Sequence, residues 1–238
     1  MFFPEEINMH LLIFVLIICF FIFLFSLYFL ANDDLIIIRK DMPMDKVFNT
    51  AFLTAFVALF FARFFYVIFY PREVFFSPLG FLLFPYFYGL SLLGGVLGGA
   101  IFLTVYAKYQ KLPVARTFDF FAVAFLSCLP IGLLGFFILA GKGYFSIFIL
   151  SFLVYLIMLV FFIKILLPFS VRGRIKNGSL SAIFLFCFSI ITFLSGIISN
   201  FKNFRLVSLE NFIILILLLA SVTLILKQEI VGKKRVRK

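Results

Sequence analysis

The sequence predicts an all-α fold: a polytopic membrane bundle of about seven transmembrane helices. Hydrophobic residues make up 65% of the chain, with 41 Phe and a mean hydropathy of +1.25, well outside the range of soluble domains. Its apolar segments each reach about the 20 residues that a helix needs to cross the hydrocarbon core. They do not alternate polar with apolar residues, as the shorter strands of a membrane barrel do. Lipid is therefore the expected solvent.

The expected spans follow one another with short connections. They run over roughly 9–31, 47–70, 87–107, 118–140, 144–167, 179–199 and 206–226. The chain has no recognisable internal repeat and no low-complexity linker. We therefore expect 1–238 to form a single transmembrane domain, with a short basic tail from about 227.

Lysine and arginine are distributed unevenly between the two sides of these spans. One side carries sixteen of them, in 32–46, 108–117, 164–178 and after Leu226, whereas the other side carries four. Arg63 is counted inside a span. The positive-inside rule then predicts an N-terminus outside the cell and a C-terminus in the cytoplasm.

The net charge of +11 does not predict nucleic-acid binding, because the basic tail follows directly on a membrane span and favours anionic lipid headgroups. Glu5 and Glu6 stand where a signal peptide would be positive, so no cleavable leader is expected. The cysteines lie within spans, which favours packing roles over a disulfide or a metal site; they are Cys19, Cys128 and Cys187. No metal and no cofactor is predicted.

The most informative motif is the run from Tyr88 to Gly99, YGLSLLGGVLGG. It contains two glycine pairs four residues apart, which fall on one face of a helix and allow a second helix to approach closely within lipid. These helix-packing glycines are Gly94, Gly95, Gly98 and Gly99.

This motif resembles the glycine-rich signature of the bacterial prolipoprotein diacylglyceryl transferases, which usually reads G-L/M-S-F-H-G-G-L-x-G-G. The resemblance extends over nearly the whole chain. The further matching stretches are Ala62–Tyr70, Tyr106–Asp119, Gly132–Gly141, Phe188–Gly196 and Ser208–Phe212, and Ile7–Leu12 occupies the place of a further family motif. The number and orientation of the spans agree with that family.

The resemblance implies transfer of a diacylglyceryl group from phosphatidylglycerol to a cysteine thiol of a secreted precursor, with release of glycerol phosphate. It also implies a multi-pass protein of the bacterial cytoplasmic (inner) membrane. Most polar residues of the family's site are replaced here. The positions with a changed residue are His10, Leu93, Leu133, Phe136, Leu139, Gly141, Thr192 and Gly196, and the retained polar residues are Arg63, Tyr66, Ser91 and Asp119.

Arg63 is the candidate lipid- and phosphate-binding cation, about 10 Å below the end of its span. The alternative is that its side chain extends to the interface without a ligand. Tyr66 and Ser91 are candidate lipid contacts, and their alternative role is hydrogen bonding between helices. His10 is the candidate base, or else a histidine tolerated at the interface. Asp119 is interpreted as a charge at a helix N-terminus.

Three functions remain open at this point. The first is a working transferase with a site rearranged around Arg63, His10 and Ser91. The second, which the replaced residues favour, is an impaired or non-catalytic relative that binds phosphatidylglycerol, another anionic lipid or the signal peptides of prolipoproteins. A small transporter is disfavoured, because the spans carry no paired charges along a pathway.

Overall fold

The computed structural model describes residues 9–32, 43–71, 75, 77, 80–81, 89–140, 145–199 and 208–228. Within these residues the regular structure is entirely helical. Seven of the helical segments are long and apolar enough to cross a membrane, which confirms the predicted fold class. The basic tail after Gln228 and the connection 33–42 lie outside the described residues.

The helices succeed one another along the chain as the hydropathy pattern predicts. They are α1 (Met9–Asn32), α3 (Met44–Phe69), α5 (Leu92–Tyr109), α6 (Val114–Ala140), α7 (Phe145–Phe161), the π-helix η3 (Phe162–Leu166), α8 (Leu167–Val171), α9 (Ser179–Ser199) and α10 (Leu209–Leu226). The segments α7, η3 and α8 follow one another without a break and supply one span, Ile149–Val171.

Two helix boundaries differ from the prediction for local reasons. The third span begins at Leu92 rather than near residue 87, because Gly89 adopts a φ of 140° and Ser91 caps the helix from an extended backbone. The fourth begins at Val114 rather than near residue 118, directly after Pro113, which suits a helix start. Arg116 is therefore inside a helix and not in a connection.

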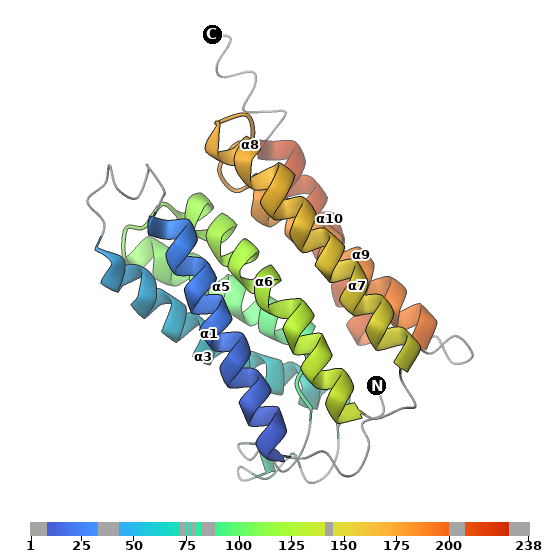
Figure 1. The fold of residues 1–238 in the computed structure, drawn as a ribbon. Helices are drawn as coiled ribbons and strands as arrows, with labels where there is room; N and C mark the ends of the chain where they lie inside the picture. The colour runs from blue at the N-terminus through green and yellow to red at the C-terminus, as the bar shows by residue number, and fades with distance from the viewer. Residues whose placement is uncertain are drawn as a thin grey trace.

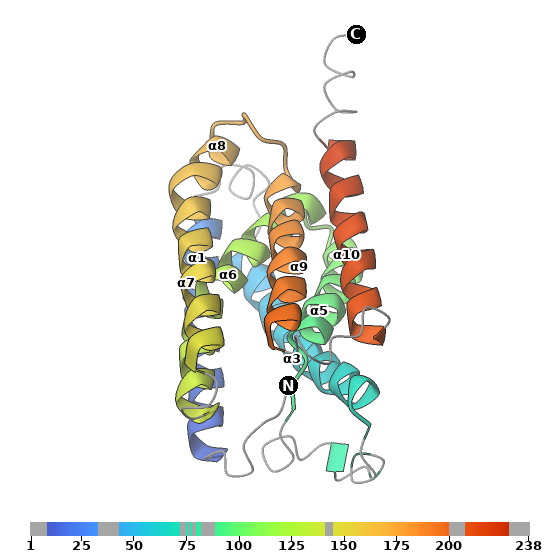
Figure 2. The same cartoon turned by 90° about the vertical axis from the view of Figure 1, so that its right-hand side faces the viewer.

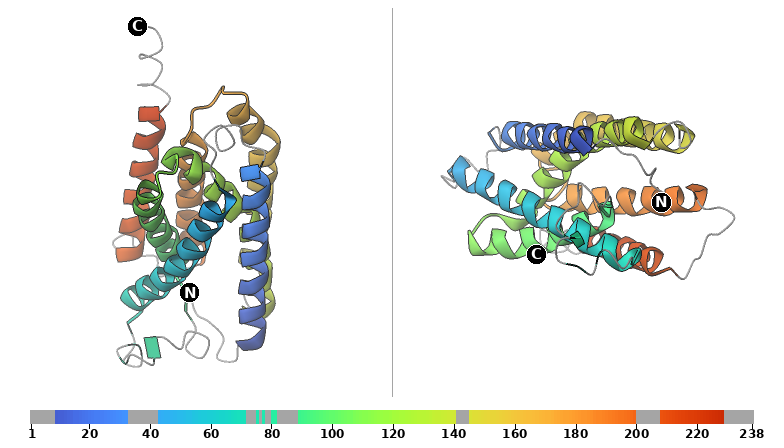
Figure 3. Two further views of the ribbon diagram at one scale, coloured as in Figure 1. Left: turned by 90° about the vertical axis from the view of Figure 1, so that its left-hand side faces the viewer. Right: turned by 90° about the horizontal axis from the view of Figure 1, so that it is seen from below.

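Helix α6 lies at the centre of the bundle. It packs against α1, α5, α7 and α9, and in Figure 1 it runs between α1, α3 and α5 on one side and α7, α9 and α10 on the other. Helix α9 stands between α7 and α10 in Figure 2. Seen from below, α1 and α10 lie on opposite sides of the molecule (Figure 3). Half of the membrane-spanning part of α6 is buried inside the bundle, a larger share than for any other span.

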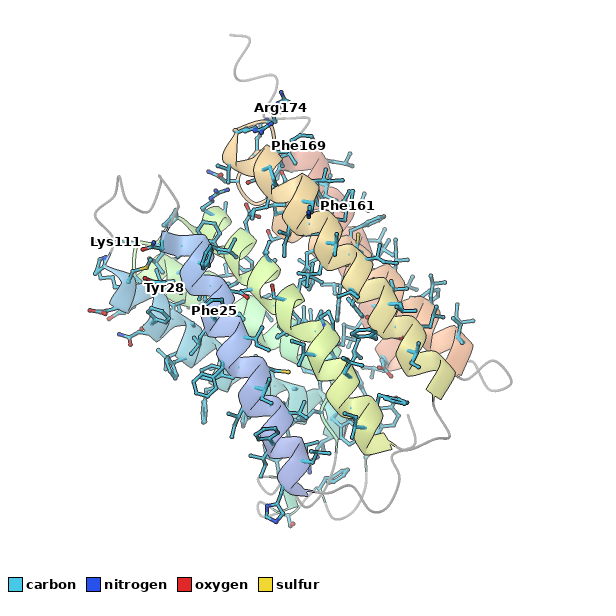
Figure 4. The ribbon with its side chains drawn as sticks, in the orientation of Figure 1. Phe25, Tyr28, Lys111, Phe161, Phe169 and Arg174 are labelled. Atoms are coloured by element: carbon cyan, nitrogen blue, oxygen red, sulfur yellow. The ribbon has the colours of Figure 1, made fainter. Side chains whose placement is uncertain are left out.

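The interior consists of two apolar clusters. The larger one joins α5, α6, α7, α9 and α10, and its members include Leu93, Leu126, Tyr155, Phe188 and Ile214. The smaller one joins α1, α3, α5 and α6 around Leu27, Ala51 and Phe121. Many large apolar side chains are exposed on the outer faces; Phe25 and Tyr28 on α1 are two of those that Figure 4 labels. An apolar surface of this extent suits contact with lipid chains.

One hydrogen bond connects the end of α3 to the start of α10. The hydroxyl of Tyr70 donates to Oε2 of Glu210 at 2.9 Å. Burial, followed by the charge and the hydrogen bond of Glu210, raises the pKa of Tyr70 above its ordinary value. The tyrosine therefore stays protonated and able to donate throughout the neutral pH range.

The two cysteines of α1 and α6 serve as packing residues. The thiol of Cys19 donates to the carbonyl of Cys128 at 3.8 Å, and the thiol of Cys128 donates to the carbonyl of Phe125 at 3.0 Å. Close to this contact, Gly132 and Gly135 give α1 room against α6; a Cβ at Gly135 would overlap Val15. Such close approach of helices depends on small residues at the contact.

Candidate functional site

The guanidinium of Arg63 is buried near the end of α3 and holds the segment that leads to α5. The residue is 3% exposed. Its Nε donates to the carbonyl of Phe81 at 3.1 Å, Nη1 to the carbonyl of Gly89 at 2.9 Å, and Nη2 to the carbonyl of Gly80 at 2.9 Å. These bonds use three of the five N–H groups of an arginine. Arg63 therefore fastens the connection between α3 and α5 at two separate places.

Two aromatic rings complete the surroundings of this arginine. The guanidinium carbon lies 4.6 Å from the ring centre of Phe75 and 5.9 Å from that of Tyr66. Tyr66 is itself 5% exposed, and a Cβ at Gly89 would overlap its ring. The φ of 140° at Gly89 is also a conformation that side chains rarely adopt. Position 89, whose carbonyl accepts a hydrogen bond from Arg63, therefore requires glycine.

Ser91 joins the same assembly through its backbone. Its N–H donates to the carbonyl of Ala62 at 2.9 Å, and its Oγ accepts from the N–H of Gly94 at 3.2 Å. The hydroxyl is thus the N-cap of α5, and the bond to another helix is made by the backbone amide rather than by the side chain. The structure brings Arg63, Tyr66 and Ser91 together; their binding of lipid stays a prediction.

The four glycines of the motif lie along the contact between α3 and α5. A Cβ at Gly94 would come 2.8 Å from the carbonyl oxygen of Phe61, and one at Gly98 would overlap the side chain of Phe61. A Cβ at Gly95 or Gly99 would meet α3 at 3.3–3.4 Å. The glycines therefore allow the backbones of α3 and α5 to approach closely, as small residues do within lipid.

His10 stands apart from this assembly. It lies in the first turn of α1, and its side chain is exposed. None of the hydrogen bonds or ring contacts recorded for the described residues joins it to Arg63, Tyr66 or Ser91. Its role as a base stays a prediction.

Two of the positions at which the resemblance implies polar side chains lie in or beside the larger apolar cluster. Leu93 is 2% exposed and belongs to that cluster, and Leu133 packs against it. Phe136 is half-buried on α6, and Thr192 and Gly196 lie on α9. Gly141 and the side chain of Leu139 are outside the described residues. Apolar packing thus occupies the two positions, 93 and 133, at which the family pattern has histidine and arginine.

Three hydroxyl groups of α9 near this cluster donate to carbonyl groups of their own helix. Ser189 donates to the carbonyl of Leu185 at 2.7 Å, Thr192 to that of Phe188 at 2.7 Å, and Ser195 to that of Thr192 at 2.9 Å. Each bond runs to a carbonyl three or four residues earlier on α9, which satisfies the hydroxyl within its own helix.

Asp119 has a structural role that the sequence indicated only in part. It is fully buried, and its two carboxylate oxygens accept from the N–H of Gly178 and, at 2.9 Å, from the N–H of Ser181. These amides belong to the start of α9. Asp119 is thus a negative charge at a helix N-terminus, as predicted, but the helix is α9 and not its own.

Arg116 is a buried polar residue that the sequence analysis assigned to a connection. It is 3% exposed, its Nη1 donates to Oγ of Ser170 at 2.7 Å, and its guanidinium carbon lies 4.8 Å from the ring centre of Phe120. Arg116 and Asp119 are three residues apart, which places them on one face of a helix. This spacing is the sequence signal that could have indicated that both residues lie on the face of α6 that meets α8 and the start of α9.

We expect Asp119→Ala to lower the stability of the protein by roughly 2–4 kcal/mol, because two buried N–H groups of α9 lose their acceptor. Asp119→Asn keeps one acceptor oxygen and should cost less. Thermal unfolding of the purified protein in detergent measures the difference. Asp45→Asn, at an exposed residue in the first turn of α3, is the matched control. Equal melting of Asp119→Ala and the wild type would contradict the capping role.

The seven spans and the close, glycine-lined contact between α3 and α5 define a multi-pass α-helical membrane protein. The model of one family, described as prolipoprotein diacylglyceryl transferase, matches residues 2–227. The chain belongs to this family, which confirms the resemblance seen in the sequence. A search of curated proteins found no significant match.

Proposed function

We propose that this protein is a bacterial inner-membrane member of the family in which diacylglyceryl transfer is impaired, and which still binds an anionic lipid or a precursor signal peptide. The observation that carries the proposal is the burial of Leu93 in one apolar cluster and the packing of the half-buried Leu133 against it, at positions where the family pattern has histidine and arginine. A leucine side chain at these two positions can neither accept nor donate a proton.

The chemistry explains why these replacements matter. In the family reaction a cysteine thiol loses its proton, its sulfur forms a bond to the glycerol carbon, and the bond from that carbon to the phosphate oxygen breaks. The thiolate is the reactive form, and the departing phosphate needs positive charge or hydrogen-bond donors. Loss of acid–base assistance alone typically lowers a rate by about 10²–10⁴-fold. The proposed impairment follows from the absence of several such groups together.

Arg63, Tyr66 and Ser91 remain the proposed lipid contacts. Support comes from the position of Arg63 near the end of its span and from its rigid placement by three carbonyl groups. Because those bonds use three of its five N–H groups, a phosphate would bind through the other two. Phosphatidylglycerol is the ligand that the family reaction suggests.

The proposed orientation places the end of α3 outside the cell and the ends of α8 and α10 in the cytoplasm. Apart from the two buried arginines, Arg63 and Arg116, the cations of the described residues support it. Lys46, Lys108, Lys111, Lys164, Arg172, Arg174, Lys176 and Lys227 all lie at or near the end of the bundle where α1, α5, α8 and α10 finish. The positive-inside rule assigns that end to the cytoplasm.

Two measurements on the full-length protein test the proposal. The first is complementation of a bacterial strain depleted of its own transferase, with prolipoprotein processing as the readout and an intact family member as the positive control. The second incubates the purified protein with phosphatidylglycerol and a peptide bearing the acceptor cysteine, and follows peptide lipidation and release of glycerol phosphate. Native mass spectrometry of the same sample detects retained phosphatidylglycerol or peptide.

We expect no complementation and no lipidated peptide, with phosphatidylglycerol or peptide retained by the protein. Lipidated peptide with an equal amount of glycerol phosphate would overturn the impairment and favour the rearranged site with His10, Arg63 and Ser91. Neither lipidation nor any retained lipid or peptide would overturn the proposed binding role. Immunoblotting of the membranes confirms that the protein is present in the depleted strain.

A further inference from the structure

A group of cations surrounds α8 at the end of the bundle opposite to Arg63. Arg172 and Arg174, in the connection from α8 to α9, are exposed, as are Lys164 in η3 and Lys227 just after α10. We call Lys164, Arg172, Arg174 and Lys227 the α8 cation group. Figure 4 labels Arg174 and Phe169 beside each other at this end and Phe161 further along the same span.

Two contacts hold this region in a defined shape. The Nζ of Lys176 donates to the carbonyl of Gln228 at 3.0 Å, which ties the end of α10 to the connection between α8 and α9. The guanidinium carbon of Arg174 lies 5.5 Å from the ring centre of Phe169. A guanidinium placed over a ring directs its N–H groups outward in its own plane, where an anion can accept them. Arg174 is thus held against a ring, and the connection that carries Arg172 and Arg174 is tied to the end of α10.

Negative charge is scarce around the α8 cation group. Residues 145–199 contain no Asp and no Glu. Asp119 is the carboxylate packed against this region in the described structure, and it is fully buried with both oxygens bonded to the start of α9. The positive charge of the group is therefore not neutralised by exposed carboxylates within the described residues of α7, η3, α8 and α9.

An apolar strip lies directly next to these cations. Phe161 and Ile165 are four residues apart on the same continuous helix, so they lie on one face, and they are 46% and 42% exposed. Lys164 stands within this strip, so its ammonium group must extend along the helix to reach the headgroup level. A soluble anion would use only the charges, whereas a phospholipid would use both the charges and the strip.

We propose that the α8 cation group and this strip bind an anionic phospholipid of the surrounding leaflet, with its phosphate at Lys164, Arg172 and Arg174 and its acyl chains on Phe161 and Ile165. This site is separate from the proposed function, because it lies at the other end of the bundle from Arg63 and involves none of the family's site residues. Electrostatic attraction of each basic residue near an anionic surface is worth about fivefold in affinity.

The test compares two triple variants that remove the same charge from the same end of the protein. One is Lys164→Gln/Arg172→Gln/Arg174→Gln, and the control is Lys46→Gln/Lys108→Gln/Lys111→Gln, at exposed residues of α3, α5 and the connection that follows α5. Each protein is placed in nanodiscs of phosphatidylcholine with increasing phosphatidylglycerol. Native mass spectrometry counts the phosphatidylglycerol molecules retained after gentle release, with and without added inorganic phosphate.

Phosphatidylglycerol at the site proposed around Arg63 is unaffected by either variant and stays in all three proteins. We expect the first variant to hold the additional phosphatidylglycerol of the α8 site at least tenfold more weakly than the wild type, and the control variant to hold it nearly as well. Equal weakening of both variants would show general attraction of a charged face and would overturn a defined site. Unchanged retention in the first variant would overturn the proposal outright. Displacement by millimolar inorganic phosphate would show a phosphate site that does not use the strip, which contradicts a lipid ligand. Equal melting temperatures confirm that all three proteins are folded.

Discussion

Replacing Arg63 by alanine is expected to lower the stability of the protein by at least about 2 kcal/mol, because three carbonyl groups at the end of α3 lose their donor. A buried carbonyl without a partner costs roughly 1–3 kcal/mol, and the three contributions are not additive. The segment that the arginine fastens also carries Gly89 and Ser91, which set the start of α5. Thermal unfolding in detergent, together with limited proteolysis between α3 and α5, measures the effect.

Arg63→Lys separates the charge from the geometry. Lysine keeps the positive charge but offers a compact ammonium group, which cannot reach three separate carbonyls as a planar guanidinium does. We expect its stability to fall between those of the wild type and Arg63→Ala. Arg172→Ala, at an exposed arginine, is the control for loss of charge alone. Melting of Arg63→Ala at the temperature of this control would contradict the fastening role.

Replacing Gly98 by alanine is expected to be the most damaging single-methyl change in the contact between α3 and α5. The new Cβ would overlap Phe61, so the helices must separate or the ring must move. Overpacking of this kind typically costs about 1–3 kcal/mol. Gly94→Ala should behave similarly, since its Cβ would come 2.8 Å from a backbone oxygen that cannot rotate away.

Gly95→Ala is the matched control, one residue from Gly94 on the same helix. Its Cβ would lie 3.4 Å from Ala58 and Ala62, which is ordinary contact, and alanine gains about 1 kcal/mol of helix propensity over glycine. We expect Gly95→Ala to be as stable as the wild type or slightly more stable. Thermal unfolding of the three variants checks the order, and a similar loss for Gly95→Ala and Gly98→Ala would contradict the mapped contact.

The fold was predictable because lipid imposes a simple rule on sequence. An apolar run of about 20 residues forms a helix, since a helix satisfies all backbone hydrogen bonds within the segment itself. All seven predicted spans correspond to helices in the structure. The starts of α5 and α6 were less predictable, because they depend on Gly89, Ser91 and Pro113 and not on hydropathy.

The candidate site was predictable only in part. The sequence indicated that Arg63, Tyr66 and Ser91 belong together, but not that backbone carbonyls of a distant segment are the partners of Arg63. Carbonyl groups are present at every residue, so they leave no sequence signal. Asp119 shows the same limit, because its spacing from Arg116 is visible whereas its bonds to the start of α9 depend on how α6 and α9 pack.

The central position of α6 has a consequence for biosynthesis. Its packing partner α1 is made first, yet two further spans leave the ribosome before α6 appears. Until α6 is made, Val15 and Cys19 of α1 lack their packing partners, Gly135 and Gly132. Helix α1 is then in the bilayer without the helix it finally packs against. Contacts between segments so far apart in the chain form late during folding. Translation must therefore proceed past Gly135 before α1 can pack against α6. In shorter nascent chains α1 is exposed to quality-control proteases without this contact.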